Sequence, residues 1–243
     1  MKKFLWLWIF GMFVVLAPPA HALFTNGGFQ TGDFTGWTIE HGKNPGLITN
    51  PPNAYVGVPV SERVNWLSGP WLDNDYYSDP LGLYNYYFSS FFSAPVTRAE
   101  ITSGIGYDFV ARSLPVVKYG LHSARVNSWD WNAHATRIYQ EDWLTAADKD
   151  AADGRFHIRF AWAAVLEDPN HYAYEQPYFH IILKNVTTGQ ELYSQFFYSN
   201  QPGFPWQTDN VVDPRGESRW VWVDWREVDL DITDNVAVGN LLR

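Results

Sequence analysis

Hydrophobic and polar residues alternate along most of this chain, and the alternation is clearest at residues 155–166. A period of two is typical of a β-strand, because successive side chains point to opposite faces of a sheet. One face of this predicted strand is aromatic and aliphatic, whereas the other carries polar and small residues such as His157 and Arg159. The hydrophobic face consists of Phe156, Ile158, Phe160, Trp162, Ala164 and Leu166.

Similar short patterns, separated by turn residues, predict further strands at residues 178–184, 191–198, 220–225 and 227–232. The first two are joined by a short loop that contains Gly189, which indicates a hairpin. Only residues 141–154 have a helix-like composition, and we expect a loop there with one helical turn. The pattern therefore predicts an all-β protein, a sandwich or a barrel.

The first 22 residues have the three parts of a secretory signal peptide. Lys2 and Lys3 provide the positive start, residues 4–16 are apolar, and Ala20-His21-Ala22 is a small-x-small cleavage site. The apolar run is too short to span a membrane, which takes about 20 residues. We expect cleavage after Ala22, a single domain at residues 23–243 and a secreted product, extracellular or periplasmic, with no membrane span after cleavage.

Charge and composition then narrow the range of partners. The net charge is −9, which argues against nucleic acid and against anionic membrane surfaces. The chain contains no cysteine, so its fold depends on the core rather than on disulfides. Aromatic residues make up 18% of the chain, and they can fill a core or form the flat surfaces on which sugar rings stack.

Residues 50–95 form a long, proline-containing and aromatic-rich segment, which we interpret as an insertion. Long irregular connections are often functional. The segment could cover an open sheet edge, contact a protein partner or bind a ligand, and for ligand binding we select Trp66 and Trp71.

Trp129, Asp130, Trp131 and Asn132 are the best ligand candidates, because two tryptophans alternate with two hydrogen-bonding side chains. In a strand the tryptophans would share one face. Sugar binding uses such an aromatic plane beside polar groups. A pair of core tryptophans explains the same pattern equally well.

The loop at residues 167–175 brings Asp168, His171 and Glu175 together in the sequence. These side chains could form a metal or acid–base site. Alternatively, Asp168 and Asn170 could cap their own turn through bonds to the backbone, and we favour this interpretation.

Motifs for catalysis are not found in the sequence. Neither the paired carboxylate spacing of laminarinase-type hydrolases, nor G-x-S-x-G, nor H-E-x-x-H occurs. The acidic residues Asp229 and Asp231 alternate with apolar ones and are typical of a solvated strand face. We therefore expect a protein that is not an enzyme, although a secreted glycan hydrolase or lyase with another motif is an alternative.

The stretch at 26–37, NGGFQTGDFTGW, resembles the opening strand of bacterial exported jelly-roll modules of the carbohydrate-binding and galactose-binding types. Residues 161–183, AWAAVLEDPNHYAYEQPYFHIIL, resemble their central hairpin. The resemblance implies a jelly-roll β-sandwich. Relatives of this kind often hold a structural calcium ion with a glutamate at the position where this chain has Gln30, and an amide is a weaker calcium ligand than a carboxylate. They also usually close the sheet with a further strand, which would begin at about residues 238–243 of this chain. We expect no cofactor.

Taken together, these patterns predict a secreted, non-catalytic binding protein for polysaccharide or cell-surface glycan. An extracellular structural or adhesive protein, with residues 50–95 as a protein contact, is the alternative.

Overall fold

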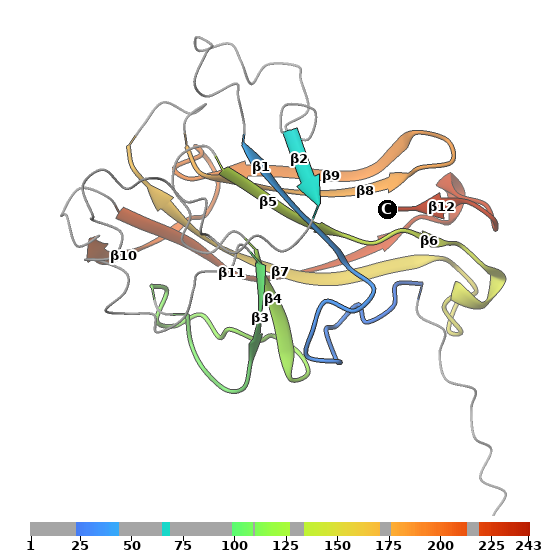
Figure 1. Cartoon of the computed structure of the whole chain (residues 1–243), viewed down its shortest axis with the longest axis horizontal. Coiled ribbons are helices and arrows are strands. Elements are labelled where there is room, and N and C mark those ends of the chain that lie inside the picture. The colour runs from blue at the N-terminus through green and yellow to red at the C-terminus, as the bar shows by residue number, and fades with distance from the viewer. Residues whose placement is uncertain are drawn as a thin grey trace, which may run out of the picture.

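The computed structural model describes residues 23–43, 65–68, 99–108, 110–126, 134–170, 176–212 and 219–243. For residues 41–43, 65–68, 134 and 209–212 it describes the backbone alone. Within these ranges the protein is all-β: its strands form four antiparallel sheets, and the described residues contain no α-helix (Figure 1). This architecture confirms the predicted class and is consistent with a β-sandwich.

One layer contains the strands β10 (Gln207–Val212), β11 (Arg219–Asp231) and β7 (His157–Asp168), in that order. The alternating run predicted at 155–166 is therefore confirmed as β7. The two strands predicted at 220–225 and 227–232 are instead one continuous strand, β11. A bulge between Val223 and Arg226 adds an extra residue to β11, which shifts the hydrophobic alternation and produces two apparent strands in the sequence.

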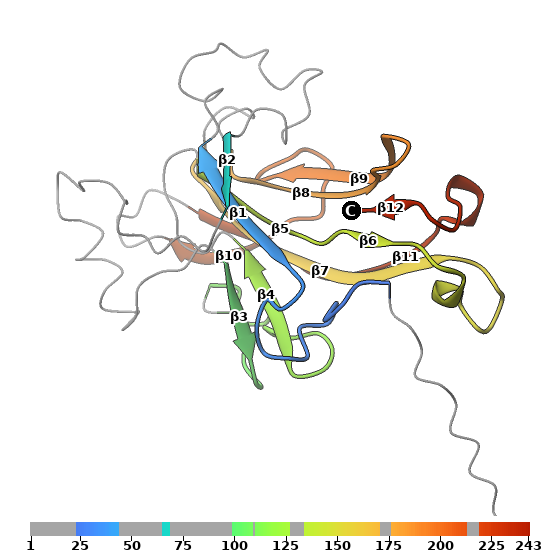
Figure 2. The ribbon, with the colours of Figure 1, turned by 45° about the vertical axis from the view of Figure 1, so that its right-hand side comes forward.

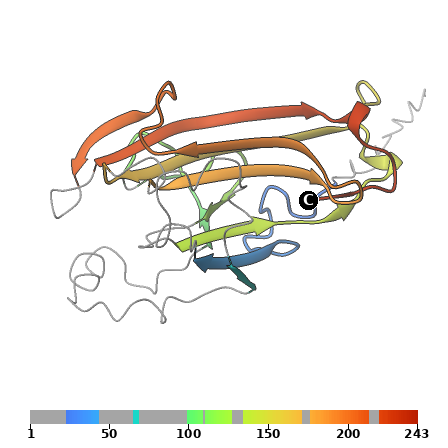
Figure 3. The ribbon, with the colours of Figure 1, turned by 90° about the horizontal axis from the view of Figure 1, so that it is seen from above.

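The other layer contains β6 (Asp142–Trp143), β12 (Leu241–Leu242), β8 (Tyr178–Asn185) and β9 (Gln190–Tyr198). A second sheet, in the order β2 (Asn65–Ser68), β1 (Thr38–Lys43) and β5 (His134–Tyr139), continues this layer, because β6 begins shortly after β5 ends. Seen from above, β10, β11 and β7 lie along one side of the molecule, and β5, β1 and β2 lie along the other (Figure 3). The predicted hairpin of 178–184 and 191–198 is confirmed as β8 and β9.

The core lies between β7–β11 and β8–β9. Leu144, Leu183 and Leu242 are buried there, with Leu23 and Phe156 beside them. Farther along β7, the Trp162 ring packs on two rings of the hairpin, with centroids 4.7 Å from Phe179 and 5.4 Å from Phe197. The hydrophobic face predicted for β7 thus packs against the second layer.

A hairpin of β3 (Ala99–Ser103) and β4 (His122–Val126) projects from these layers (Figure 2). The loop between its strands packs Ala111 and Leu114 on Trp222 of β11. The indole of Trp225 also donates to the carbonyl oxygen of Pro115 at 2.7 Å. This loop therefore covers part of the face of β11 that carries Trp222 and Trp225.

The opening stretch 26–37 is not a strand, contrary to the resemblance, and the first strand begins at Thr38. Its polar side chains bond to its own backbone: Asn26 donates to the carbonyl oxygens of Asp33 and Thr35, and Asp33 accepts from the amide of Thr35. Asn26 and Phe29 also have positive φ angles, which end regular pairing. Phe29 and Trp37 stack on each other within these turns, at 5.1 Å between centroids.

The segment predicted as a loop at 141–154 contains the short strand β6, which was not expected, and a single helical turn, the 3₁₀ turn at Ala146–Asp148, which was expected. Of the aromatic segment at 50–95, only β2 lies among the described residues, so the predicted insertion cannot be followed in this structure. Across the described ranges, no helix has the length and apolar character needed to cross a membrane.

Candidate functional site

Most of the ligand candidates selected from the sequence lie outside the described residues. Among them, Trp66 is placed in β2 by its backbone, and Asp168 is described in full. Those outside are Trp71, Trp129, Asp130, Trp131, Asn132, His171 and Glu175.

The sheet β2-β1-β5 places the backbone of Trp66 two strands away from β5. Trp66 pairs with Gly42 of β1, and Gly42 pairs with Ala135 of β5. Two strand spacings separate Trp66 from Ala135, about 10 Å. Since Asn132 precedes Ala135 by only three residues in the sequence, the backbone of Trp66 lies near the start of β5, where the segment 129–132 ends.

Asp168 organises the loops at the end of β7. Its Oδ1 atom accepts hydrogen bonds from the amide of Asn170 at 3.2 Å and from the side chains of Gln176 at 3.2 Å and Asn200 at 3.1 Å. The side chain of Gln176 in turn accepts a hydrogen bond from Ser199 at 2.8 Å. Asp168 therefore has the turn-capping role that we favoured, while a metal or acid–base site with His171 and Glu175 stays a prediction.

An exposed surface of β5, β6 and β12 contains a candidate binding site that the sequence analysis missed. Burial alternates along residues 140–144: Gln140 and Leu144 are buried, whereas Glu141 and Trp143 point outward. Trp143 is 58% exposed. We call this surface the outer face, defined by Tyr139, Glu141, Trp143, Leu241 and Arg243.

Ion pairs fix the polar groups of the outer face. Nε of Arg243 donates to Oε1 of Glu141 at 2.7 Å, and a second guanidinium nitrogen of Arg243 contacts the same oxygen. The guanidinium of Arg243 also lies 4.8 Å from the centroid of the Tyr139 ring. Where β5 pairs with β1, Nε of Arg137 donates to Glu40 at 2.7 Å. The guanidinium of Arg137 lies 5.2 Å from the centroid of the Tyr139 ring.

This arrangement suits a polar ligand with flat apolar faces. Trp143 of β6 pairs with Leu241 of β12. Glu141 and Arg243 are two residues away from this pair along their strands and lie on the same face. An exposed aromatic plane beside a carboxylate and a guanidinium can stack on a sugar ring and bond its hydroxyl groups. The period-two spacing of Tyr139, Glu141 and Trp143 was the available signal. Arg243, which completes the site, is about a hundred residues away in the sequence, so its contribution depends on β12.

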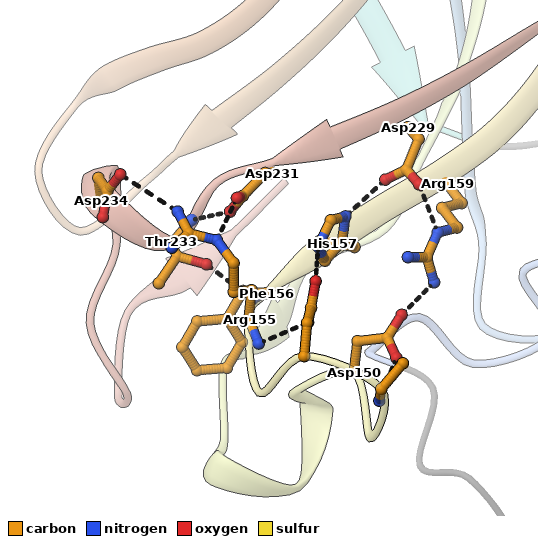
Figure 4. Close-up of polar contacts among 11 residues, drawn as sticks. Asp150, Arg155, Phe156, His157, Arg159, Asp229, Asp231, Thr233 and Asp234 are labelled. Carbon is orange, nitrogen blue, oxygen red and sulfur yellow. Dashed lines mark hydrogen bonds and ion pairs between the residues drawn. The ribbon is translucent and has the colours of Figure 1, made fainter.

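A second polar group, the β7–β11 charge cluster, lies where the two strands meet the loop at 149–156 (Figure 4). His157 Nδ1 lies 2.6 Å from Asp229 Oδ1, and His157 Nε2 lies 3.1 Å from Asp153 Oδ2. Arg159 bonds to the other oxygen of Asp229 at 2.8 Å and to Asp150 at 2.6 Å. The predicted solvated face of β11 is therefore also an ion-pair surface.

The neighbours of this cluster shift several ionisation equilibria. The hydrogen bond from Arg155 lowers the pKa of Asp231 to about 2. Hydrogen bonds from Arg159 and His157 lower the pKa of Asp229, and the bond to Asp229 raises the pKa of His157. Despite these acidic side chains, the described part of the chain contains no group of three or more His, Cys, Asp or Glu placed to hold a metal ion.

Neither a protein family, nor a curated protein, nor a solved structure matches this chain. The geometry of the chain itself is therefore the basis for the functional proposal.

Proposed function

We propose that this chain is a secreted, non-catalytic carbohydrate-binding protein built as a single jelly-roll domain, and that the outer face contributes to its ligand site. The observation that carries the proposal is the exposed Trp143 beside the Glu141–Arg243 ion pair. An indole that is 58% exposed contributes little to the core, and its free ring face is available to stack on a ligand.

The described charges of the outer face favour binding over hydrolysis. Glycoside hydrolysis requires two carboxyl groups on either side of the bond, one acting as an acid and one as a base or nucleophile. Here Glu141 is held by Arg243, and Glu40 is held by Arg137. The Glu141 carboxylate can accept hydrogen bonds from hydroxyl groups, and its guanidinium partner fixes its orientation.

The outer face also adjoins the sheet that holds Trp66. β6 follows β5 along the chain. Across the sheet, β5 pairs with β1, and β1 pairs with β2. A polysaccharide that crosses the outer face along β5 would therefore reach the start of that strand, next to the segment 129–132.

The test is a glycan and polysaccharide binding screen of the chain from Leu23, with tryptophan fluorescence as the readout, followed by Trp143→Ala. We expect the variant to bind the best glycan at least about fivefold more weakly, since aromatic contacts add about 1 kcal/mol beyond their buried area. Tyr107→Ala is the matched control, because Tyr107 is similarly exposed, at 64%, but lies on the β3–β4 hairpin. Equal loss in both variants, or saturable binding that ignores Trp143, contradicts the proposed site.

An adhesive or structural role is the second candidate, and the β3–β4 hairpin favours it. Four strongly exposed apolar residues lie in the loop that joins β3 to β4: Ile105, Tyr107, Tyr119 and Leu121. Exposed apolar patches are typical of protein contacts. A folded protein that binds no glycan, but whose association in light scattering is abolished by Ile105→Ser with Leu121→Ser, would support this role.

A further inference from the structure

His157 contacts a carboxylate with each nitrogen of its ring. Nδ1 lies 2.6 Å from Asp229 on β11, and Nε2 lies 3.1 Å from Asp153 in the loop at 149–156. The histidine side chain is only 14% exposed. A single imidazole therefore joins β7, β11 and the loop, as the close-up shows (Figure 4).

These two contacts require a charged imidazolium. An ionised carboxylate only accepts hydrogen bonds, and a neutral imidazole has just one N–H to donate. Asp229 also accepts from Arg159 at 2.8 Å, and Asp153 accepts from the amide of Arg155 at 2.9 Å, so both carboxylates are placed as acceptors. Only the doubly protonated ring donates to both of them.

The other charged groups around His157 are aspartates and arginines, and each arginine pairs with two of the aspartates. Arg159 on the same strand bridges Asp229 and Asp150. Arg155 contacts Asp231 on β11, opposite His157 in the ladder, and Asp234 beyond the end of that strand. Around His157 the structure thus describes five carboxylates and two arginines, and the histidine is the group whose charge changes between pH 5 and 8.

Besides its own backbone hydrogen bonds, the loop at 149–156 is attached to the side chains of β7 at two points of different chemistry. The Arg159–Asp150 ion pair, at 2.6 Å, fixes its beginning. The His157–Asp153 contact fixes its far end, just before Phe156, which is buried in the core. Phe156 itself is bonded at its backbone to Thr233 and Ile232, so the end of the loop borders the core.

We propose that His157 is a pH-sensitive latch, which holds the 150–155 segment against β7 and β11 when protonated and releases Asp153 when deprotonated. The neutral ring keeps one donor, and the shorter contact, to Asp229, retains it. The Asp153 end of the loop then loses its attachment, while the Asp150 end remains fixed by Arg159.

The direction of the pH dependence follows from the ionisation of His157. Hydrogen bonding to Asp229, followed by bonding to Asp153, raises its pKa in the folded protein above the ordinary value of 6.5. The latch is therefore fully closed below pH 6.5. It weakens as the pH rises toward the folded-state pKa, by at most about tenfold per pH unit for one proton, and is released above that value.

The experiment combines an NMR titration of the His157 ring with amide hydrogen exchange of the full mature chain between pH 5.5 and 9. The reporters are the amides of Asp150 and Gly154, which bond to carbonyl oxygens within the loop at 2.7 and 2.8 Å. We expect the protection factor of Gly154 to fall, by at most about tenfold per pH unit, as His157 loses its proton, and that of Asp150 to change less. The Gly189 amide, in the β8–β9 turn, is the internal control.

Asp153→Asn is the decisive variant. An asparagine amide can accept from the imidazolium and can donate to the neutral ring, so the contact persists at both ends of the titration. We expect the variant to remain folded with a Gly154 protection factor that does not depend on pH, and His157→Gln to lack the pH dependence as well. A His157 pKa at or below 6.5, pH-independent protection in the wild-type chain, or an unchanged pH dependence in Asp153→Asn would overturn the proposal.

Discussion

Asn185 stands where the sequence suggests an exposed turn, since Asn185-Val186-Thr187 reads as a glycosylation sequon or a hairpin. In the structure its side chain is completely buried. It donates to the side chain of Asn240 at 2.9 Å and accepts from the amide of Thr188 at 3.2 Å. The hairpin interpretation is confirmed, and the side chain connects the β8–β9 turn to the chain just before β12.

Replacing Asn185 with alanine is expected to cost about 1–3 kcal/mol of unfolding free energy, because buried polar partners lose their hydrogen bonds. Urea denaturation measures the change. Gln190→Ala at the other end of the same turn is the control, because Gln190 is exposed and should shift stability by less than about 0.5 kcal/mol. Similar losses in both variants would show that the turn, rather than the Asn185 contacts, carries the effect.

Single residues could be assigned from the sequence only where local chemistry decides their role. Asp168 was expected to cap its own turn, and its contact with the amide of Asn170 agrees with this. The contacts of Asp168 with Asn200, and of His157 with Asp229, join residues that are far apart in the sequence. Local patterns contain no information about such pairs.

At the scale of elements, the two-residue strand β12 has an influence far beyond its length. Leu242 pairs with Asp142 of β6 and with Asn185 of β8, so that β12 joins these strands into one sheet. Its side chain is fully buried in the core. The strand also places Arg243 beside Glu141, which completes the outer face.

We therefore expect Leu242→Ala to lower the unfolding free energy by about 2–5 kcal/mol, as for other buried leucines. Val238→Ala, at an exposed position just before the strand, should change it little. Both can be measured by chemical denaturation monitored by circular dichroism. A loss below 1 kcal/mol for Leu242→Ala would show that β12 is not a structural part of the sheet.

Strands with long regular alternation were predicted well, whereas short or irregular elements were not. β7, β8 and β9 follow their hydrophobic patterns closely. The strand predicted at 26–37 was wrong, because the side chains of Asn26 and Asp33 form hydrogen bonds with the local backbone. These bonds stabilise turns and replace the pairing with a neighbouring strand. β12 is too short to have a detectable period.

For the whole molecule, we expect the stability of the fold not to depend on a bound calcium ion. Two side-chain oxygens in the opening segment already accept hydrogen bonds within its turns. Oδ1 of Asp33 accepts from Thr31 and Thr35, and Oδ1 of Asn26 accepts from the amide of Thr31. Gln30 offers a neutral amide where a carboxylate would bind more strongly.

A chelator such as EDTA should accordingly leave the Tm of the chain from Leu23 unchanged in a scanning calorimetry experiment. A loss of only 1 kcal/mol would lower the Tm of a chain of this size by about 2–4 °C, which is readily measured. A decrease of that size, reversed by added calcium, would show that the fold holds a structural ion after all.

By itself, the sequence determined the class of fold and the position of its longest strands, because a period of two in hydrophobicity reports which face of a strand is buried. It also determined the acidic charge and the absence of cysteine. Only the tertiary structure decided which distant strands became neighbours. β12 reaches Glu141 across about a hundred residues, and β11 brings Asp229 to His157, since pairing between strands depends on the whole chain rather than on any local pattern.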